Sequence, residues 1–389
     1  MQPYESRFAR MFGPDYFAFG FWKARVALYA ILQGLELKDN DEVILPGYTC
    51  VVVPNSVRYV GAKPVYADIS AANYNIDPKS VERKSTKRTR VLIAQHTYGL
   101  PADMNSLRCI AQQQGLFLIE DCAHVLLHST QSGKALGSFG DAAFFSFQWS
   151  KPYTTGLGGM AVTRNIDLAN KLASIQKTFQ NPSRSKNLQL QVQYSLFRRF
   201  FKPQLYWKSQ GLLNKLSRLG LFVGSSNAKE LTGGRPADFT WKMSPFQHRA
   251  GLREMGKIQE NSTHREKLTA YYMNALQRHS WPTIETDGLN LNGFRLLRVP
   301  VAVKGKGSLL SEAKRSGIEI GSWFESPLHP LRLREHRGLN YELGSCPVAE
   351  SAAKHTVNLP LHPRVDTNAA EKIMSFILTK ASPADLSNS

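Results

Sequence analysis

Leu116-Phe117-Leu118-Ile119-Glu120-Asp121-Cys122-Ala123-His124 is the stretch that best indicates the fold. Its first four residues are all apolar, and such a run predicts a strand that is buried on both faces of a sheet. Two carboxylates follow directly. A carboxylate at a buried strand end is costly unless a cation or hydrogen bonds compensate it. Asp121 is therefore either a structural cap or ion-pair partner, or a functional group.

A second apolar strand leads into a lysine. The run 142–147 predicts a strand, and Lys151 follows it, flanked by aromatic residues, a proline and a glycine-rich turn. These neighbours indicate a lysine that is held in place and partly desolvated, so that its amine can be neutral and attack a carbonyl. A carboxylate that pairs with the pyridinium nitrogen is the second requirement of pyridoxal phosphate chemistry, and Asp121 is placed to supply it. The hydroxyl of Ser146 and a helix N-terminus near Ala24-Arg25-Val26 are predicted to hold the phosphate.

The remaining pattern is that of an α/β protein. Apolar strands alternate with short helices, which predicts a mainly parallel sheet covered on both faces, with the ligand beyond the carboxyl ends of the strands. A longer helical pattern runs over 246–276. The predicted strands are 41–47, 91–94, 116–119, 142–147 and 160–163, and the predicted helices of this part are 24–35 and 107–114.

The length of 389 residues fits two domains. We expect a large domain over 1–257 and a smaller α+β domain over 258–389. A segment at about 181–236 breaks the alternating pattern and is expected to be a basic amphipathic insertion, which ends in the linker-like Gly233-Gly234 and Pro236.

The composition is that of a globular protein, with 42% hydrophobic and 10% aromatic residues. The N-terminus shows no signal-peptide pattern, and no window approaches the ~20 apolar residues of a spanning helix. We therefore expect a soluble cytoplasmic protein. The four cysteines are scattered without a CxxC pair, which argues against a zinc site and a disulfide framework. Reduced thiols and no metal are expected.

The formal net charge of +19 is unevenly distributed. From Leu168 to Lys229 there is no Asp or Glu, whereas eleven Lys and Arg residues occur there. A solvated insertion on the enzyme surface is one interpretation. Peripheral contact of residues 195–220 with the inner face of a membrane is another, because basic and apolar residues alternate there at near-helical spacing. Nucleic-acid binding is disfavoured, since no recognised binding motif accompanies the charge.

Several further motifs, in consistent order along nearly the whole chain, resemble the DegT/StrS family of sugar aminotransferases. The matching stretches are 41–49, 61–69, 74–78, 96–104, 120–124, 137–151 and 358–363.

The resemblance implies a fold type I aminotransferase with pyridoxal 5′-phosphate as cofactor and Lys151 as the Schiff-base lysine and proton carrier. It implies that Asp121 pairs with the pyridine nitrogen, that His124 hydrogen-bonds the ring hydroxyl, and that Ser146 and the backbone of residues 24–26 bind the phosphate. The substrates of such enzymes are nucleotide-linked keto-sugars, aminated with glutamate as donor, often in polysaccharide biosynthesis. Members are usually homodimers with shared active sites.

The chain departs from the family pattern at four positions. Ala24-Arg25 replaces a common Gly-Thr, and an arginine there is expected to strengthen phosphate binding. Cys50 stands where an aromatic residue often stacks on the cofactor ring. Thr240 stands where an asparagine from the neighbouring subunit often reaches the phosphate, and Leu157 replaces a common acidic residue. His96 and His329 are candidates for contact with the substrate.

Two alternatives remain. A sugar dehydratase of the same family would carry histidine at the position of Lys151, so the lysine argues against it. A non-catalytic regulator or membrane-associated scaffold is suggested by the replacements at Cys50, Thr240 and Leu157. Retention of Asp121, Ser146 and Lys151 argues against that second alternative, because a scaffold has no reason to keep all three.

Overall fold

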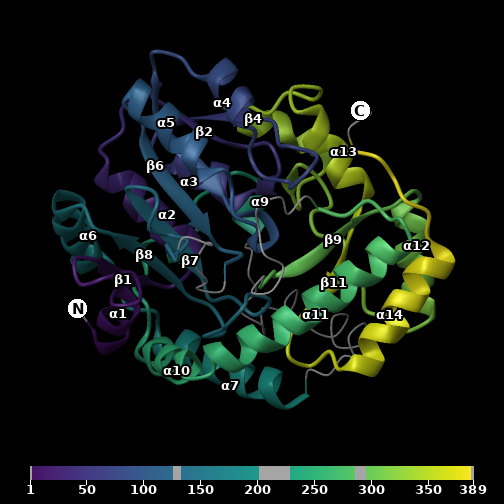
Figure 1. The fold of residues 1–389 in the computed structure, drawn as a ribbon. Helices are drawn as coiled ribbons and strands as arrows, with labels where there is room; N and C mark the ends of the chain where they lie inside the picture. Colours follow the sequence, from purple (N-terminus) through teal and green to yellow (C-terminus); the bar gives the residue numbers. More distant parts are fainter. Residues whose placement is uncertain (1, 126–132, 201–227, 285–294, 387–389) are drawn as a thin grey trace.

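A seven-stranded sheet forms the centre of the protein (Figure 1). The computed structural model describes residues 2–125, 133–200, 228–284 and 295–386. The strand order is β1-β8-β7-β6-β5-β2-β4. Strands β4, β2, β5, β6 and β7 run parallel, whereas β8 is antiparallel to both β7 and β1. The bounds are β1 Phe17–Phe21, β2 Glu42–Pro46, β4 Lys63–Ala67, β5 Thr89–Gln95, β6 Phe117–Cys122, β7 Ala142–Ser146 and β8 Gly159–Thr163.

Helices cover both faces of this sheet (Figure 1), which confirms the predicted α/β class with a mainly parallel sheet. Helix α2 is buried over almost its whole length, because it packs on β7 and β8 and is covered by α3 and α6. The helices of this part are α1 Pro3–Ala9, α2 Ala24–Gly34, α3 Val52–Tyr59, α4 Pro78–Lys84, α5 Met104–Gln114, α6 Ile166–Thr178, α7 Arg184–Phe200, α9 Ala228–Leu231 and α10 Pro245–Met255, with 3-10 turns η1 Thr97–Gly99 and η3 Ala237–Thr240.

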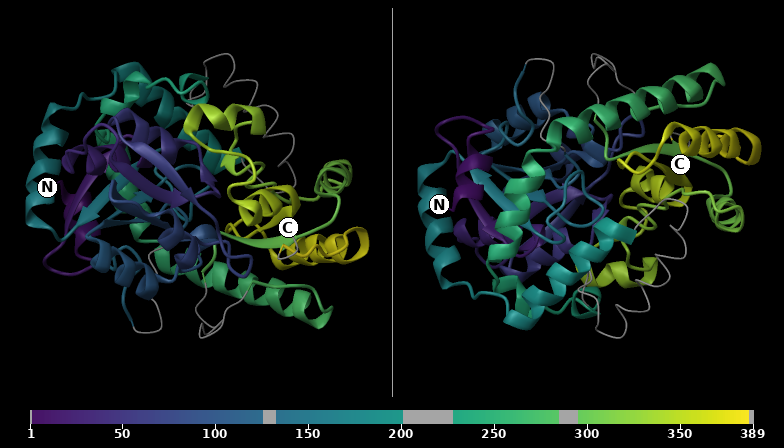
Figure 2. Two further views of the ribbon diagram at one scale, coloured as in Figure 1. Left: turned by 90° about the horizontal axis from the view of Figure 1, so that it is seen from above. Right: turned by 90° about the horizontal axis from the view of Figure 1, so that it is seen from below.

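The C-terminal part adds a small antiparallel sheet of β9 and β11, flanked by long helices (Figure 2). It also returns to the central part, because β10 pairs in parallel with the short strand β3. One hydrophobic cluster continues from the central sheet into this part. The division at residue 258 stays a prediction, and α11 begins there. The elements are β3 Thr49–Cys50, α11 Ile258–Arg278, β9 Arg298–Ala302, α12 Lys306–Arg315, β10 Leu328–His329, η4 Leu333–Leu339, α13 Pro347–His355, β11 Thr356–Pro360 and α14 Thr367–Lys380.

The structure differs from the sequence-based expectations in three respects. The helical pattern over 246–276 is divided into α10 and α11, which are separated at Gly256 and Lys257. Strand β6 extends to Cys122, so that Glu120 and Asp121 lie inside the strand rather than after it. Strands β1 and β4 are not identified from the sequence pattern, and they are the two edge strands of the sheet.

The basic insertion is described only at its two ends, since residues 201–227 lie outside the described part. Its first portion forms α7. Among the described helices, none combines the length and the apolar character that crossing a bilayer requires.

Gly159 fixes the position of α2 on the sheet. A Cβ atom at this position would lie 2.3 Å from Cα of Ala24, so the two backbones are in direct contact. Gly159 also pairs with Ser146 across β7 and β8. The close approach therefore sets the N-terminus of α2 beside the end of β7.

Gly159→Ala should destabilise the protein by about 1–3 kcal/mol, because the added methyl group forces backbone apart in a packed region. Gly307→Ala is the matched control. Nothing lies within 4 Å of a Cβ at position 307 in α12, and alanine favours helix there. Urea denaturation followed by circular dichroism measures both variants. Equal midpoints for Gly159→Ala and the wild type would contradict the role assigned to this contact.

Candidate active site

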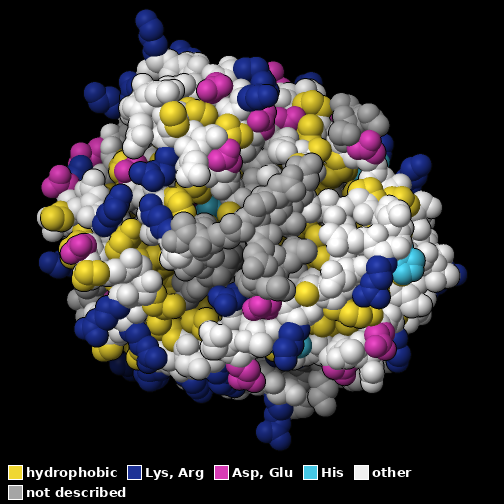
Figure 3. Space-filling view, viewed as in Figure 1, with side chains coloured by type: hydrophobic (Ala, Val, Ile, Leu, Met, Phe, Trp, Pro, Cys, Tyr) yellow, Lys and Arg dark blue, Asp and Glu magenta, His cyan; other side chains and the backbone are white. Residues whose placement is uncertain are grey.

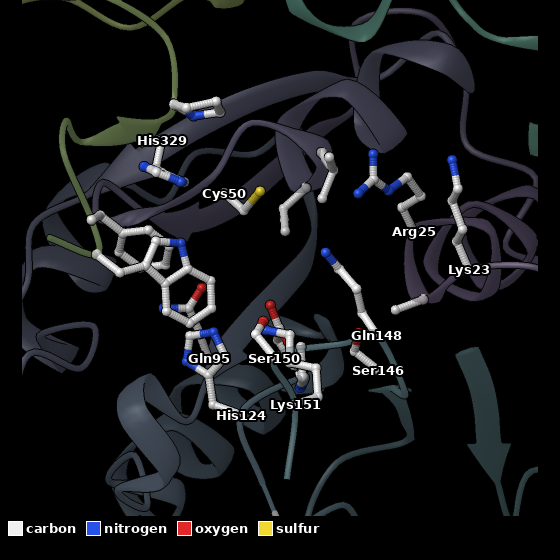
Figure 4. Close-up of a pocket in the computed structure, with 18 of the residues that line it drawn as sticks. Lys23, Arg25, Cys50, Gln95, His124, Ser146, Gln148, Ser150, Lys151 and His329 are labelled. Atoms are coloured by element: carbon white, nitrogen blue, oxygen red, sulfur yellow. Dashed lines mark hydrogen bonds between the residues drawn. The ribbon is translucent and has the colours of Figure 1, made fainter. Parts of the chain in front are cut away.

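A cavity of about 430 Å³ lies beyond the carboxyl ends of the parallel strands (Figure 4). Gln95 ends β5, Asp121 lies at the end of β6, and Ser146 ends β7, and all three line the cavity. Parallel strands end at the same edge of a sheet, so residues far apart in the sequence meet there. The opposite wall comes from residues 321–325 and from His329 and Pro330 of the C-terminal part.

Asp121 is buried, with 4% of its surface exposed. Its Oδ1 accepts a hydrogen bond from the backbone N–H of Ala123 at 2.9 Å. Burial raises the pKa of this carboxyl to about 6, although that hydrogen bond and the charge of Lys151 act in the opposite direction. With a pKa of about 6, Asp121 is mostly ionised near neutral pH, and the Ala123 N–H and the charge of Lys151 stabilise its ionised form in part.

Lys151 is also buried, with 9% exposed. The loop that carries it is closed by hydrogen bonds, since Phe147 N–H donates to Gly158 O at 3.0 Å and Thr155 N–H donates to Phe147 O at 3.0 Å. Burial lowers the pKa of the Lys151 amine to about 8, against the attraction of Asp121. A substantial neutral fraction is thus present near physiological pH, as nucleophilic attack by an amine requires.

These two groups fit pyridoxal phosphate. The cofactor needs an amine for its aldehyde carbon and an anion for its ring nitrogen, and Asp121 and Lys151 supply them in one cavity. Each acts on the pKa of the other through its charge, which places them within electrostatic range.

His124 lines the same cavity and is neutral, because burial and then the charge of Lys151 hold its pKa well below the usual range. Its Nδ1 accepts a hydrogen bond from the backbone N–H of Tyr98 at 3.1 Å. In a neutral imidazole the other nitrogen then carries the proton. Nε2–H is therefore a donor, as required of a residue that hydrogen-bonds a ring oxygen.

The N-terminus of α2 forms the other end of the cavity, where Figure 4 shows Lys23 and Arg25 near Ser146 and away from His124 and His329. Both cations are already paired. Lys23 Nζ lies 2.6 Å from Asp238, and Arg25 Nη1 lies 2.5 Å from the buried Glu230. Ala24 also lines the cavity, whereas the N–H of Val26, the next residue of the predicted phosphate site, donates to Lys23 O at 3.0 Å.

Three other residues singled out from the sequence also line the cavity. Cys50 is half-buried and lies within electrostatic range of Arg25 and Lys151. Burial raises the pKa of its thiol. His329 is half-buried, and burial lowers its pKa to about 4. Leu157 is buried in an apolar cluster with Trp22 and Leu190.

The structure places His96 and Thr240 elsewhere. His96 is fully buried, with Nε2 3.0 Å from Glu120 Oε2 and Nδ1 accepting from Ala102 N–H. Glu120 also accepts backbone N–H groups from residues 137, 139 and 140. His96, Glu120 and Cys122 have donor atoms within 4.8 Å of one another, but these bonds already use the histidine and the carboxylate. Thr240 does not line its own chain's cavity, and its hydroxyl donates to Ala237 O at 3.2 Å.

Several lining residues are not identified from the sequence. Gln95 directly follows an apolar strand, which is the same signal that singles out Asp121. Trp323 and Arg298 carry no such signal, because they come from the C-terminal part and reach the cavity only through the fold. The Trp323 ring lies 4.4 Å from Lys151 Nζ and 4.8 Å from the His124 ring.

Comparisons with known proteins show the family of the chain. Residues 1–378 match the DegT/DnrJ/EryC1/StrS aminotransferase family. The spore coat polysaccharide biosynthesis protein SpsC of Bacillus subtilis is 26% identical over 99% of this chain and 90% of its own. UDP-N-acetyl-3-dehydro-alpha-D-glucosamine 3-aminotransferase of Acidithiobacillus ferrooxidans is 41% identical over 39% of this chain and 41% of its own.

Among solved structures, S. venezuelae DesV in complex with a ketimine intermediate has a TM-score of 0.73 and 25% identity, over 98% of this chain and 89% of that one. This likeness confirms the aminotransferase fold. The chain therefore belongs to the DegT/DnrJ/EryC1/StrS aminotransferase family and is a pyridoxal phosphate-dependent aminotransferase.

Proposed function

We propose that this enzyme transfers an amino group from glutamate to a nucleotide-linked keto-sugar in the biosynthesis of a surface polysaccharide or a related glycan. The observation that carries the proposal is the buried pair of Asp121 and Lys151 in one cavity. The names of the relatives, which include a polysaccharide biosynthesis protein and a nucleotide-sugar aminotransferase, support the substrate class.

We further propose the role of each residue. When bound, pyridoxal phosphate supplies an electron sink for the substrate carbon that gains or loses a proton. Lys151 would attach the cofactor and, once released, would carry a proton between a substrate carbon and the cofactor. Asp121 holds a proton on the ring nitrogen by its negative charge, and His124 donates from Nε2 to the ring oxygen. Trp323 closes one side of the cavity and excludes water.

The phosphate is assigned to the N-terminus of α2 and to Ser146. Backbone N–H groups and the helix dipole favour an anion at a helix N-terminus. Arg25 adds a cation there, and Glu230 holds its guanidinium in place. Cys50 and Leu157 line the same cavity, where they contribute to its shape and add no charge.

A homodimer with shared active sites is also proposed. Thr240 is predicted to contact phosphate but does not line the cavity of its own chain, so such contact requires a second copy. We also propose a cytoplasmic location, because the proposed nucleotide-linked substrates are supplied there.

Helix α7 supports peripheral membrane contact of the basic insertion. Its inner face is buried through Leu190 and Tyr194, whereas Leu188, Val192 and Leu196 are 61%, 51% and 51% exposed and recur every four residues. That spacing makes one apolar stripe on the outer face. No Asp or Glu occurs from Leu168 to Lys229, so the charged residues of this segment are all basic, and one of them, Arg198, pairs with Glu254 of α10. Figure 3 shows Lys and Arg side chains around much of the surface on the face it presents.

Lys151→Ala should abolish stable attachment of pyridoxal phosphate and lower turnover by about 10³-fold or more, because one group both attaches the cofactor and moves protons. Borohydride reduction followed by mass spectrometry measures attachment, and the loss of visible absorbance on adding glutamate tests the donor. Lys87→Ala, at an exposed lysine, is the control. Undiminished turnover in Lys151→Ala would remove the proposed mechanism.

Attachment of pyridoxal phosphate to cofactor-free protein should accelerate with pH and reach half its maximal rate near pH 8. The folded-state pKa of Lys151 is about 8, below its ordinary 10.5, so the reactive neutral amine appears as pH rises through 8. Asp121→Asn should shift this midpoint to lower pH, because the Asp121 charge raises the Lys151 pKa. Stopped-flow absorbance measures the rate, and a wild-type midpoint near 10 would contradict the assignment.

Replacing Leu188, Val192 and Leu196 by serine should weaken binding to phosphatidylglycerol vesicles by about tenfold or more, because the three side chains lose apolar burial in the interface. Ile166→Ser is the matched control, since Ile166 is 66% exposed on a different helix, α6. Co-sedimentation measures binding. Arg198 is left unchanged because it pairs with Glu254 at 2.7 Å. Equal vesicle binding by the triple variant and the wild type would reject membrane contact through α7.

A further inference from the structure

Arg298 is a cation of the active-site cavity that the proposed chemistry does not use. It lines the cavity at the start of β9. The cations at the opposite end are neutralised, Lys23 by Asp238 and Arg25 by Glu230. Arg298, by contrast, forms no salt bridge with any carboxylate in the described ranges of the chain. A half-buried guanidinium without an anion is a candidate ligand-binding group.

The guanidinium is seated against a glycine. A Cβ atom at Gly321 would lie 2.4 Å from Nη1 of Arg298, so a larger residue at position 321 would require the guanidinium to move. The backbone of Gly321 is fixed by two hydrogen bonds with Asn358, of 2.8 and 2.9 Å. The Asn358 side chain also accepts from Trp323 N–H at 2.7 Å. Arg298 therefore lies on a backbone that is held in position.

Lys306 holds the same segment from another side. Its ammonium donates to the carbonyl oxygens of Ser322, Phe324 and Ala353 at 2.8–3.1 Å. The nearby carboxylate of Glu325 is exposed and accepts from the hydroxyl of Ser322 at 2.7 Å. The side chains of Asn358 and Lys306 thus hold the backbone around Arg298, and the guanidinium lines the cavity.

Arg298 and Lys151 face the same small volume. The Arg298 guanidinium lies 5.7 Å and Lys151 Nζ lies 4.4 Å from the centre of the Trp323 ring. The charge of Arg298 also contributes to the lowered pKa values of Lys151, His124 and His329, each of which burial lowers first. Asp121 acts on the charge of Lys151, and Glu325, which also lines the cavity, forms no salt bridge with Arg298. The Arg298 guanidinium is therefore available to an anionic group of a substrate.

An amino-acid donor meets this requirement. Its nitrogen must reach the position of the Lys151 amine, and it carries a carboxylate a few bonds from that nitrogen. Guanidinium groups bind carboxylates through paired, charge-assisted hydrogen bonds. We infer that Arg298 binds a carboxylate of the amino donor and so selects amino acids over simple amines. This inference rests on the proposed aminotransferase function and names the residue that recognises the donor.

The test uses protein loaded with pyridoxal phosphate and glutarate, a dicarboxylate without an amine, so that binding is measured without turnover. Isothermal titration calorimetry of Arg298→Gln should show glutarate affinity reduced about tenfold or more, the value of a lost charge-assisted hydrogen bond. Binding of UDP, a probe for the nucleotide diphosphate of the sugar substrate, should stay within about twofold of wild type.

Two further variants make the result specific. Gly321→Ala should weaken glutarate binding without changing any charge, because its methyl group displaces the guanidinium and residue 321 has an ordinary backbone conformation. Arg334→Gln removes an exposed arginine of the C-terminal part and should leave both affinities unchanged. Unchanged glutarate affinity in Arg298→Gln overturns the inference. Weakened UDP binding with intact glutarate binding also overturns it, and assigns Arg298 to the diphosphate.

The experiments distinguish a failure of the proposed function from a failure of the Arg298 assignment. If Lys151→Ala retained full turnover, the aminotransferase mechanism would be lost, yet a reduced glutarate affinity in Arg298→Gln would still establish a carboxylate site. If Lys151 behaves as expected and glutarate binding does not change, only the assignment of Arg298 is wrong.

Discussion

The burial of one amine and one carboxylate in a single cavity is the constraint on which the rest of the structure depends. Removal from water favours the neutral form of each, which brings the pKa of Lys151 down to about 8 and that of Asp121 up to about 6. Their mutual attraction offsets part of that cost. Both pKa values lie near neutral pH because the surrounding strands and the Lys151 loop keep the two groups buried.

The two ends of the cavity differ in how their cations are paired. At the N-terminus of α2, Lys23 and Arg25 each have a carboxylate partner, so the cations are held in place before any phosphate binds. The contact of Gly159 with Ala24 keeps this helix end beside Ser146. At the other end, Arg298 and Lys151 both lie near Trp323, and Lys151 is attracted by Asp121 whereas Arg298 forms no salt bridge with a carboxylate of the described residues. A ligand with a phosphate at one end and a substrate carboxylate at the other would place an anion at each end of the cavity.

Helix α7 connects the basic insertion to the catalytic loop. Trp149, two residues before Lys151, stacks near Tyr194 and Phe197 of α7, with ring centres 6.4 and 5.2 Å apart. Leu157, at the far end of the same loop, shares an apolar cluster with Leu190 of that helix. The inner face of α7 therefore supports the loop, while its outer face leaves Leu188, Val192 and Leu196 in contact with solvent.

The sequence by itself determined the sheet class, most of its central strands and the edge at which Asp121, Ser146 and Lys151 meet. It could do so because buried parallel strands are continuous apolar runs, and the residues that follow them share one edge. Tertiary structure alone decided that His96 is bonded to Glu120 outside the cavity while His329 lines it. It also brought in Trp323 and Arg298, since contacts between distant segments leave no periodic signal in a chain. The break between α10 and α11 was decided in the same way, by packing rather than by the helical pattern.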